Sequence, residues 1–167
     1  MPCHVASIDS PLGPLTLVWD ETGVRHLLLP GQRHSPSDRT EWLPHEGAGH
    51  PAMQAALALL SGQDAPAGLL LAPAGTAFQQ RVWAVLQTIP RGELRTYAQV
   101  ADAIGQPGSV RAVGAAIGRN PLPLLIPCHR VVGSNGNLTG FSGGIAAKRW
   151  LLQREGIALD PLRDRLA

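Results

Sequence analysis

The alternation of apolar and polar residues near the start of the chain predicts short β-strands. Apolar and polar side chains alternate over residues 14–19, and a mostly apolar run follows at 24–29. Turn-forming residues at 20–23 separate the two runs, as expected for consecutive strands. A polar stretch rich in proline and glycine, from residue 31 to about 51, then predicts a long loop or linker.

Helical spacing of apolar residues, capping residues and terminal glycines predict helices in the rest of the chain. The expected ranges are 53–60, 78–89, 97–104, 110–118 and 145–155. Thr96 and Gln99 have the form of a capping box, and Ser109 is a candidate cap for the next helix. Two short helices joined by a tight turn that contains glycine form a helix-turn-helix pattern, although helical hairpins of this size are common without DNA.

The helix expected over 110–118 has an unusual surface. It has almost no bulk, with small residues at five positions: Ala112, Gly114, Ala115, Ala116 and Gly118. Arg111 and Arg119 lie at its two ends. A smooth helix can approach either a neighbouring helix or a nucleic-acid groove, and the residues themselves favour neither reading.

Charge is distributed unevenly along the chain. The net charge is only +2, but residues 1–80 hold three basic and seven acidic residues, whereas residues 81–167 hold eleven basic and five acidic ones. The second half is therefore the candidate for contact with a polyanion, although a solvated basic face is the common alternative.

Length and composition limit the class of protein. A chain of 167 residues can form one good-sized domain or two small ones. It has no run of about 18 apolar residues and no secretory signal at its start, so we expect a cytoplasmic protein without a membrane span. Its two cysteines, Cys3 and Cys128, are then free thiols. Cys3 and His4, completed by His26 or His34, could form a zinc site, but no C-x-x-C pair supports one, so neither metal nor cofactor is expected.

The strongest candidate for chemistry is Cys128. It lies between an apolar proline-containing segment and the basic pair His129 and Arg130. Only the thiolate is nucleophilic, and neighbouring positive charges favour it. A lone cysteine is more often an inert buried residue, but the adjacent basic pair weighs against that reading here. Glu155 could orient the histidine in a Cys-His-acid set, which spacing alone leaves open.

At these residues the sequence resembles the O6-alkylguanine-DNA alkyltransferases. The run Ile126-Pro127-Cys128-His129-Arg130-Val131 is similar to the active-site signature of that family. Further matches follow in the family's order: Gly75-Thr76-x-Phe78-Gln79-x-x-Val82-Trp83, Thr96-Tyr97-Ala98, Arg111-Ala112-Val113-Gly114-Ala115, Asn120-Pro121, Gly140-Phe141-Ser142-Gly143-Gly144 and Trp150-Leu151-Leu152. The first half matches more loosely, chiefly over residues 10–15.

The resemblance implies an α+β fold with two domains. Residues 1–74 would form a ribonuclease-H-like α/β domain. Residues 75–167 would form a mostly helical domain with a winged helix-turn-helix, which binds DNA and accepts the alkyl group. The implied partner is double-stranded DNA containing O6-alkylguanine, bound through its minor groove by a monomer.

The resemblance also implies the reaction. Cys128 would irreversibly take an alkyl group from O6 of guanine, and also from O4 of thymine, once per protein molecule. His129, linked through a water and held by Glu155, would take the thiol proton. Asn120 would fix the turn that presents the cysteine. The base must leave the stack, because its O6 cannot otherwise reach a buried thiolate.

Further roles concern the base and the duplex. Tyr97 and Ser142 would hydrogen-bond the flipped guanine, backbone groups of Cys128 and Val131 would contact its other edge, and Phe141 would form an apolar lid. Arg111 would fill the gap left in the duplex. The remaining DNA contacts would come from the small-residue helix, through Ala112, Ala115 and Arg119.

Two positions depart from the family's pattern, and two other functions compete with this one. Phe141 stands where many members have tyrosine, and Ile117 where many bacterial members have asparagine; either could alter alkyl range or DNA affinity. A cysteine hydrolase could use Cys128 and His129, but it would need turnover and an oxyanion hole. A DNA-binding module without chemistry would leave this pair unexplained.

Overall fold

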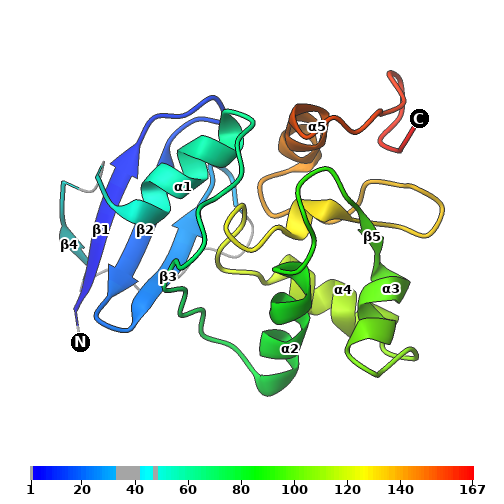
Figure 1. Cartoon of the computed structure of the whole chain (residues 1–167), viewed down its shortest axis with the longest axis horizontal. Coiled ribbons are helices and arrows are strands. Elements are labelled where there is room, and N and C mark those ends of the chain that lie inside the picture. The colour runs from blue at the N-terminus through cyan, green and yellow to red at the C-terminus, as the bar shows by residue number, and fades with distance from the viewer. Residues whose placement is uncertain (1, 33–41, 47–48) are drawn as a thin grey trace.

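The computed structural model describes residues 2–32, 42–46 and 49–167. The fold is mixed α and β, with a small sheet at one end and most of the helices at the other (Figure 1). One continuous cluster of buried apolar side chains runs from the sheet into the helices. In the part of the chain that the structure describes, no helix is both long and apolar enough to cross a membrane.

Four strands form the main sheet in the order β3-β2-β1-β4. The strands are β1 (Cys3–Ile8), β2 (Leu15–Asp20), β3 (Gly23–Leu28) and β4 (Trp42–Pro44). β1, β2 and β3 form an antiparallel meander, whereas β4 pairs with β1 in parallel. Leu15 and Leu17 point from β2 into the core, as the alternation predicted.

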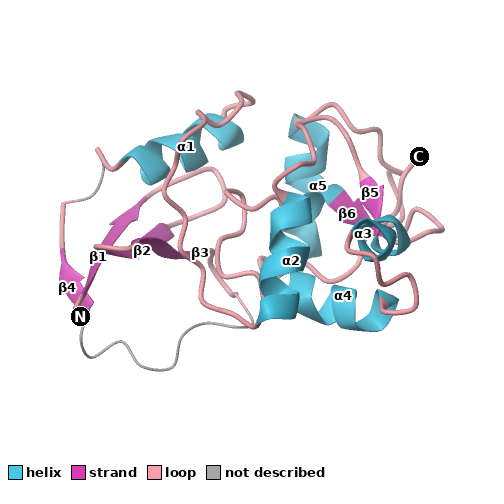
Figure 2. Cartoon of the chain, turned by 60° about the horizontal axis from the view of Figure 1, so that its bottom comes forward, coloured by secondary structure: helices cyan, strands magenta, loops and turns pink. Residues whose placement is uncertain are grey.

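Helix α1 (Pro51–Leu60) packs its apolar residues into the same core as the sheet. Proline at the first position suits a helix start, since its missing N–H would have no intrahelical partner. The side chain of His50 accepts a hydrogen bond from the backbone N–H of Ala52 and caps the helix. Figure 2 shows α1 on one side of the sheet and the remaining helices grouped apart from it.

Three helices form the centre of the other end: α2 (Ala77–Leu86), α3 (Tyr97–Ala103) and α4 (Val110–Gly118). α4 packs against both α2 and α3. Trp83 of α2 is almost fully buried and donates a hydrogen bond from its indole nitrogen to the carbonyl of Ala116, at 2.9 Å. α4 is thereby fixed on its inner face.

The segment that follows holds the signature. A 3₁₀ turn, η1 (Cys128–Arg130), leads into the short strand β6 (Val131–Val132), which pairs in parallel with β5 (Arg95–Thr96). Helix α5 (Ile145–Arg154) packs against η1. The last ten residues lie along the loop after β6, where Leu138 donates its N–H to the carbonyl of Asp164.

Most of the expected elements are confirmed. The two predicted strands correspond to β2 and β3, and Thr96 and Gln99 form the predicted capping box of α3. The predicted helices at 53–60, 110–118 and 145–155 correspond to α1, α4 and α5 within three residues.

Three expectations were wrong. The linker expected over 31–51 includes residues 33–41 and 47–48, which lie outside the described ranges. Its described part contains β4, which local sequence could not reveal because its partner is β1. α2 ends at Leu86 rather than near Ile89. Ser109 precedes α4 but makes no capping hydrogen bond, because its hydroxyl bonds the side chain of Gln106 instead.

Candidate active site

Asn120 organises the segment that leads to the signature. It is buried at the end of α4, and its amide donates to the carbonyl of Ile126 at 2.8 Å while its side-chain oxygen accepts from the N–H of Leu122 at 2.9 Å. The segment between these bonds includes Leu124 at φ 74°, a left-handed conformation that is unfavourable for leucine. The two bonds from Asn120 help to hold this backbone in place.

Cys128 is the first residue of η1, and its side chain is enclosed, with 4% of the residue exposed. Burial raises the pKa of the Cys128 thiol, although a hydrogen bond from Asn120 and the charge of Lys148 oppose the rise. The resting sulfur is therefore protonated, and a base is needed before it can act as a nucleophile.

This result corrects the expectation that His129 and Arg130 favour the thiolate through their charges. The guanidinium of Arg130 is bound by Glu155 and, at 2.8 Å, by the carbonyl of Ile89, so its charge is neutralised by the carboxylate. Burial lowers the pKa of His129, so this ring is neutral near pH 7. The position of His129 and Arg130 next to Cys128 in the sequence did not reveal that the histidine is neutral and that the arginine is paired with Glu155.

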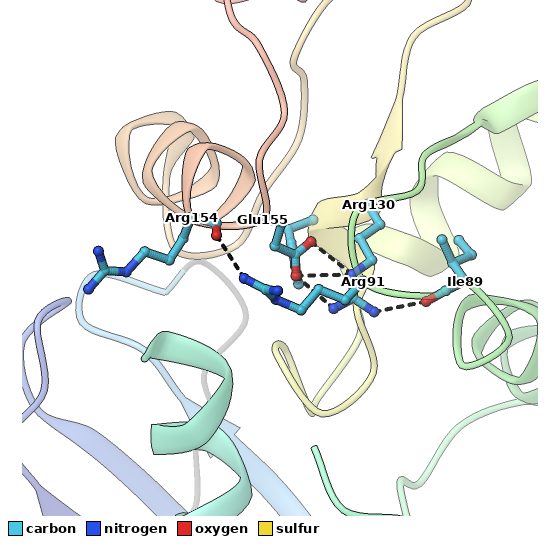
Figure 3. Close-up of polar contacts among 6 residues, drawn as sticks. Ile89, Arg91, Arg130, Arg154 and Glu155 are labelled. Atoms are coloured by element: carbon cyan, nitrogen blue, oxygen red, sulfur yellow. Dashed lines mark hydrogen bonds and ion pairs between the residues drawn. The ribbon is translucent and has the colours of Figure 1, made fainter. Parts of the chain in front are cut away.

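Glu155, immediately after α5, contacts both residues that follow the cysteine, and Figure 3 shows its contact with Arg130. Arg130 forms a two-pronged ion pair with it, at 2.9 Å from Nε to Oε1 and 2.6 Å from Nη2 to Oε2. His129 Nε2 lies 3.2 Å from Oε2. Burial raises the pKa of Glu155, but these hydrogen bonds and charges outweigh it and hold the pKa at about 2. Glu155 therefore stays ionised.

The ionised carboxylate determines the tautomer of His129. A carboxylate accepts hydrogen bonds, so the neutral ring carries its proton on Nε2 and leaves a lone pair on Nδ1. Nδ1 is buried and has no hydrogen-bond partner among the described residues. The arrangement provides a neutral base in the residue that follows Cys128.

Tyr97, the first residue of α3, lies on the other side of the candidate site. Its hydroxyl donates to the carbonyl of Thr139 at 3.1 Å, and its ring lies over Gly114 of α4. Burial raises the pKa of Tyr97, and the charge of Cys128 raises it further. Tyr97 and small residues of α4 line a cavity of about 530 Å³ that reaches the loop at 133–140.

The other residues expected to contact a base lie close to these groups. Val131 follows η1 and is fully buried. Phe141 and Ser142 are buried in the loop before α5, and the Phe141 ring meets that of His129 edge-on at 6.5 Å between centroids. Six of the eight expected catalytic and base-binding residues are thus buried, and the other two, Tyr97 and Glu155, are hydrogen-bonded to Thr139 and His129 respectively.

The four expected DNA-binding residues share the exposed side of α4. They are Arg111, Ala112, Ala115 and Arg119. Ile117 lies on the opposite side, in the core, and does not belong to this surface. The inner side of α4 packs against α2 and α3, so the helix both packs and leaves a smooth face open.

Two functional candidates were missed in the sequence. Arg130 was read only as a charge near the thiol, whereas it is the main partner of Glu155. Lys148 is 1% exposed on α5 and interacts electrostatically with Cys128. A signal for Lys148 was present: it is the single lysine of the chain and falls on the buried stripe that continues with Leu151 and Leu152.

The region near Cys3 and His4 was considered for zinc. Within residues 2–32, 42–46 and 49–167, no group of three or more His, Cys, Asp or Glu side chains is arranged to hold a metal ion. His34, one of the residues considered, lies outside the described ranges.

Comparison with known proteins identifies the family. Residues 77–157 match the model of the 6-O-methylguanine DNA methyltransferase, DNA binding domain. A methylated-DNA–protein-cysteine methyltransferase of Mycobacterium bovis is 47% identical over 152 residues, which cover 91% of this chain and 92% of that protein. The chain belongs to the methylated-DNA–protein-cysteine methyltransferase family.

More distant and structural relatives agree with this assignment. The methyltransferase of Methanosarcina acetivorans is 39% identical over 92% of this chain and 98% of its own length. The crystal structure of Mycobacterium tuberculosis OGT in complex with DNA superposes with a TM-score of 0.86, at 46% identity, over 92% of this chain and 93% of that chain. The chain is accordingly a methyltransferase enzyme of DNA repair, and the resemblance stated from its motifs is confirmed.

Proposed function

We propose that the protein irreversibly transfers an alkyl group from O6 of guanine, and also from O4 of thymine, in double-stranded DNA to the sulfur of Cys128, once per molecule. The observation that carries the proposal is the position of the enclosed Cys128 thiol beside a neutral histidine whose Nδ1 lone pair is free. That arrangement supplies a nucleophile and a base from two consecutive residues.

The steps follow from these side chains. His129 Nδ1 takes the proton of Cys128 through a water molecule, and Glu155 stabilises the positive ring that results. The thiolate attacks the alkyl carbon, so an S–C bond forms while the C–O6 bond breaks and its electron pair stays on the guanine. Tyr97 and Ser142 hydrogen-bond the base and stabilise that charge. Asn120 keeps the cysteine presented throughout.

The product explains the single turnover. A thioether has no leaving group that water or an ordinary thiol displaces at neutral pH. The protein is therefore consumed in proportion to the lesions that it repairs.

DNA binding is assigned to the exposed side of α4. The small side chains of Ala112 and Ala115 let the helix enter the minor groove closely, and Arg111 occupies the stack after the base has flipped out. The cavity beside Tyr97 opens next to Gly114 and Gly118 of the same helix, which supports a path for the flipped base. Residues 1–74 and 75–167 form the ribonuclease-H-like and the winged helix-turn-helix domains. The protein acts as a monomer in the cytoplasm, a reducing compartment that suits its two free thiols.

The test is intact-protein mass spectrometry after incubation with duplex DNA containing O6-methylguanine. We expect one added methyl per protein, located on Cys128 by peptide analysis. Repeated turnover without an adduct would indicate a hydrolase, and DNA binding without an adduct would indicate a binding module. Either outcome overturns the proposal.

A further inference from the structure

β3 is the edge strand of the main sheet that lies toward the helical end of the molecule (Figure 1). Its last residues contact two segments of that end. The N–H of Leu27 donates to the carbonyl of Pro121, the residue after Asn120, at 2.9 Å. Leu29, the first residue after β3, approaches Gly143 in the loop before α5. The end of β3 therefore contacts the segments on either side of the signature.

The side chain of Leu29 leaves no room for a side chain at Gly143. A Cβ atom at this glycine would lie 2.8 Å from Cδ1 of Leu29 and 3.0 Å from Cε1 of Phe141. Ordinary contacts between carbon atoms are about 3.5–4.0 Å. Gly143 does not have the positive φ that favours glycine, in contrast to Gly144 at φ 94°. Lack of space, rather than backbone conformation, therefore accounts for the glycine at position 143.

Phe141 lies in the same tight turn. The N–H of Gly144 donates to the carbonyl of Phe141 at 3.0 Å and closes this turn. Phe141 is buried, and its ring is the one that meets His129 edge-on. Leu29, Phe141 and Cys128 belong to one cluster of buried side chains. The turn that carries Phe141 thus lies between the end of the sheet and the base of the candidate site.

Leu29 is itself held in place. Its N–H donates to Oε1 of Gln32 at 2.8 Å, and 5% of the residue is exposed. In a closely packed core, a side chain held in this way transmits displacement to its neighbours. Leu29 therefore limits how far the Phe141 turn can move toward the sheet.

We propose that Leu29 is a specificity-determining residue of the transfer: it holds the Phe141 turn from the sheet end and thereby limits the size of the alkyl group that Cys128 accepts. The proposal rests on the proposed function of Cys128, with Phe141 as the lid over the alkyl group. A methyl group needs little space beside the sulfur, whereas a benzyl group requires the lid to move. Since Leu29 opposes that movement, it slows the transfer of large groups more than the transfer of methyl.

The first test compares Leu29→Ala with the unmutated protein. Single-turnover rates are measured with duplex DNA that contains O6-methylguanine and with duplex DNA that contains O6-benzylguanine. Truncation should raise the ratio of the benzyl rate to the methyl rate by about tenfold or more, the effect of a methylene-sized change in an apolar pocket. If the unmutated protein takes up no benzyl group, Leu29→Ala should gain that transfer. An unchanged ratio, or an equal loss of both rates, would overturn the proposal.

Leu28→Ala is the matched control. Leu28 is the preceding leucine and is buried to a similar extent, with 6% exposed. Among the described residues, however, it is not part of the buried cluster that contains Cys128. Its truncation should lower the melting temperature and leave the ratio of the two rates unchanged. A rise in the ratio equal to that of Leu29→Ala would show a general loosening of β3 and would also overturn the proposal.

Gly143→Ala tests the contact itself. In the unmutated background the added Cβ should displace Phe141 into the space for the alkyl group and lower the benzyl-to-methyl ratio. In the Leu29→Ala background the nearest atom, Cδ1 of Leu29, is absent, so the same substitution should have a clearly smaller effect. An equal effect in both backgrounds would show that the two positions act independently, which the proposal does not allow.

A milder variant covers the case in which Leu29→Ala does not fold. Leu29→Val also lacks the Cδ1 atom but keeps more of the volume, and it should raise the ratio by a smaller factor. An unchanged ratio in folded Leu29→Val would count against the proposal in the same way. Failure of the proposed function is recognised separately, because the unmutated protein would then acquire no alkyl group on Cys128 from either duplex.

Discussion

The sheet end and the helical end of the molecule bury different kinds of side chain. In β1–β4 and α1 the buried side chains of the described residues are apolar, as for Leu17 and Met53. The five buried polar or charged ones all come from residues 120–148. They are Asn120, His129, Arg130, Ser142 and Lys148. Both ends nevertheless share one apolar core.

The difference follows from the cost of desolvation. A buried polar group is tolerated when its hydrogen bonds are replaced, and an unpaired buried charge is far more costly. Arg130, Asn120 and Lys148 each have defined partners, and these partners fix the positions of the backbone around Cys128. The sheet end is stabilised by apolar packing. The helical end instead buries polar groups whose hydrogen bonds hold the reactive side chains in one arrangement.

The largest difference between the two ends is expected when each of the two cysteines is replaced by serine. Cys128→Ser should abolish transfer, because a serine hydroxyl is a much weaker nucleophile, while affinity for lesion-containing DNA remains. Cys3→Ser, in the sheet, should react as the parent does. Intact mass after incubation with O6-methylguanine DNA measures both. Alkyl acceptance by Cys128→Ser, or its loss in Cys3→Ser, would contradict the assignment.

Glu155→Gln should impair both activity and stability. It leaves Arg130 as an unpaired buried cation, a defect that typically costs about 3–5 kcal/mol. The neutral amide also no longer stabilises a protonated His129, so transfer should fall about 100-fold or more. Urea unfolding and single-turnover rates measure the two effects, with the exposed Glu93→Gln as control.

The same variant predicts a change in acid stability. The pKa of Glu155 is held at about 2 in the folded protein, against about 4.3 for an ordinary glutamate. Its contribution to stability is complete above about pH 4.3 and is lost as the pH falls toward about 2. Glu155→Gln should remove this part of the acid dependence, and an unchanged unfolding profile would argue against the ion pair.

Leu17→Ala tests the sheet end. Leu17 is fully buried in β2, and truncation of such a leucine costs about 2–5 kcal/mol of unfolding free energy. The transfer rate of the remaining folded protein should stay within about twofold of the parent. Leu162→Ala, at a leucine that is 92% exposed, should change neither quantity. A large rate loss in folded Leu17→Ala would show that the sheet end shapes the site directly.

Arg111→Ala should slow transfer from duplex DNA without slowing the alkyl transfer step itself. Because Arg111 is exposed on α4, we expect slower transfer from duplex DNA, by about tenfold, and an unchanged reaction with free O6-benzylguanine, which requires no base flipping. Arg163→Ala, another exposed arginine, is the control. An equal loss on both substrates would instead place Arg111 in the pocket or in folding.

The smallest expected effect follows the reaction itself. The alkyl group must fit into the enclosed space around Cys128, and overfilling a packed site costs about 1–3 kcal/mol. The alkylated protein should melt at a lower temperature, with benzyl and methyl adducts differing. It should also release DNA more readily if strain reaches α4 through Asn120. Identical melting curves for the unreacted, methylated and benzylated proteins would show that the space around Cys128 accommodates the alkyl group without strain.

Local sequence determined much of this protein. The strands β2 and β3, the capping box of α3 and the extent of α4 were predicted because each depends on residues a few positions apart. The signature around Cys128 predicted the family before any coordinates, since it is a continuous run of residues.

Only the tertiary structure decided the electrostatics of the site. Arg130 and Glu155 are 25 residues apart, so sequence could not show that this pair forms or that it removes the arginine's charge from the thiol. The pairing of β4 with β1 and the link from Lys148 to Tyr97 through Thr139 are likewise long-range. Burial reversed the expected shift of the Cys128 pKa, because desolvation depends on every segment packed around the sulfur rather than on its neighbours in sequence.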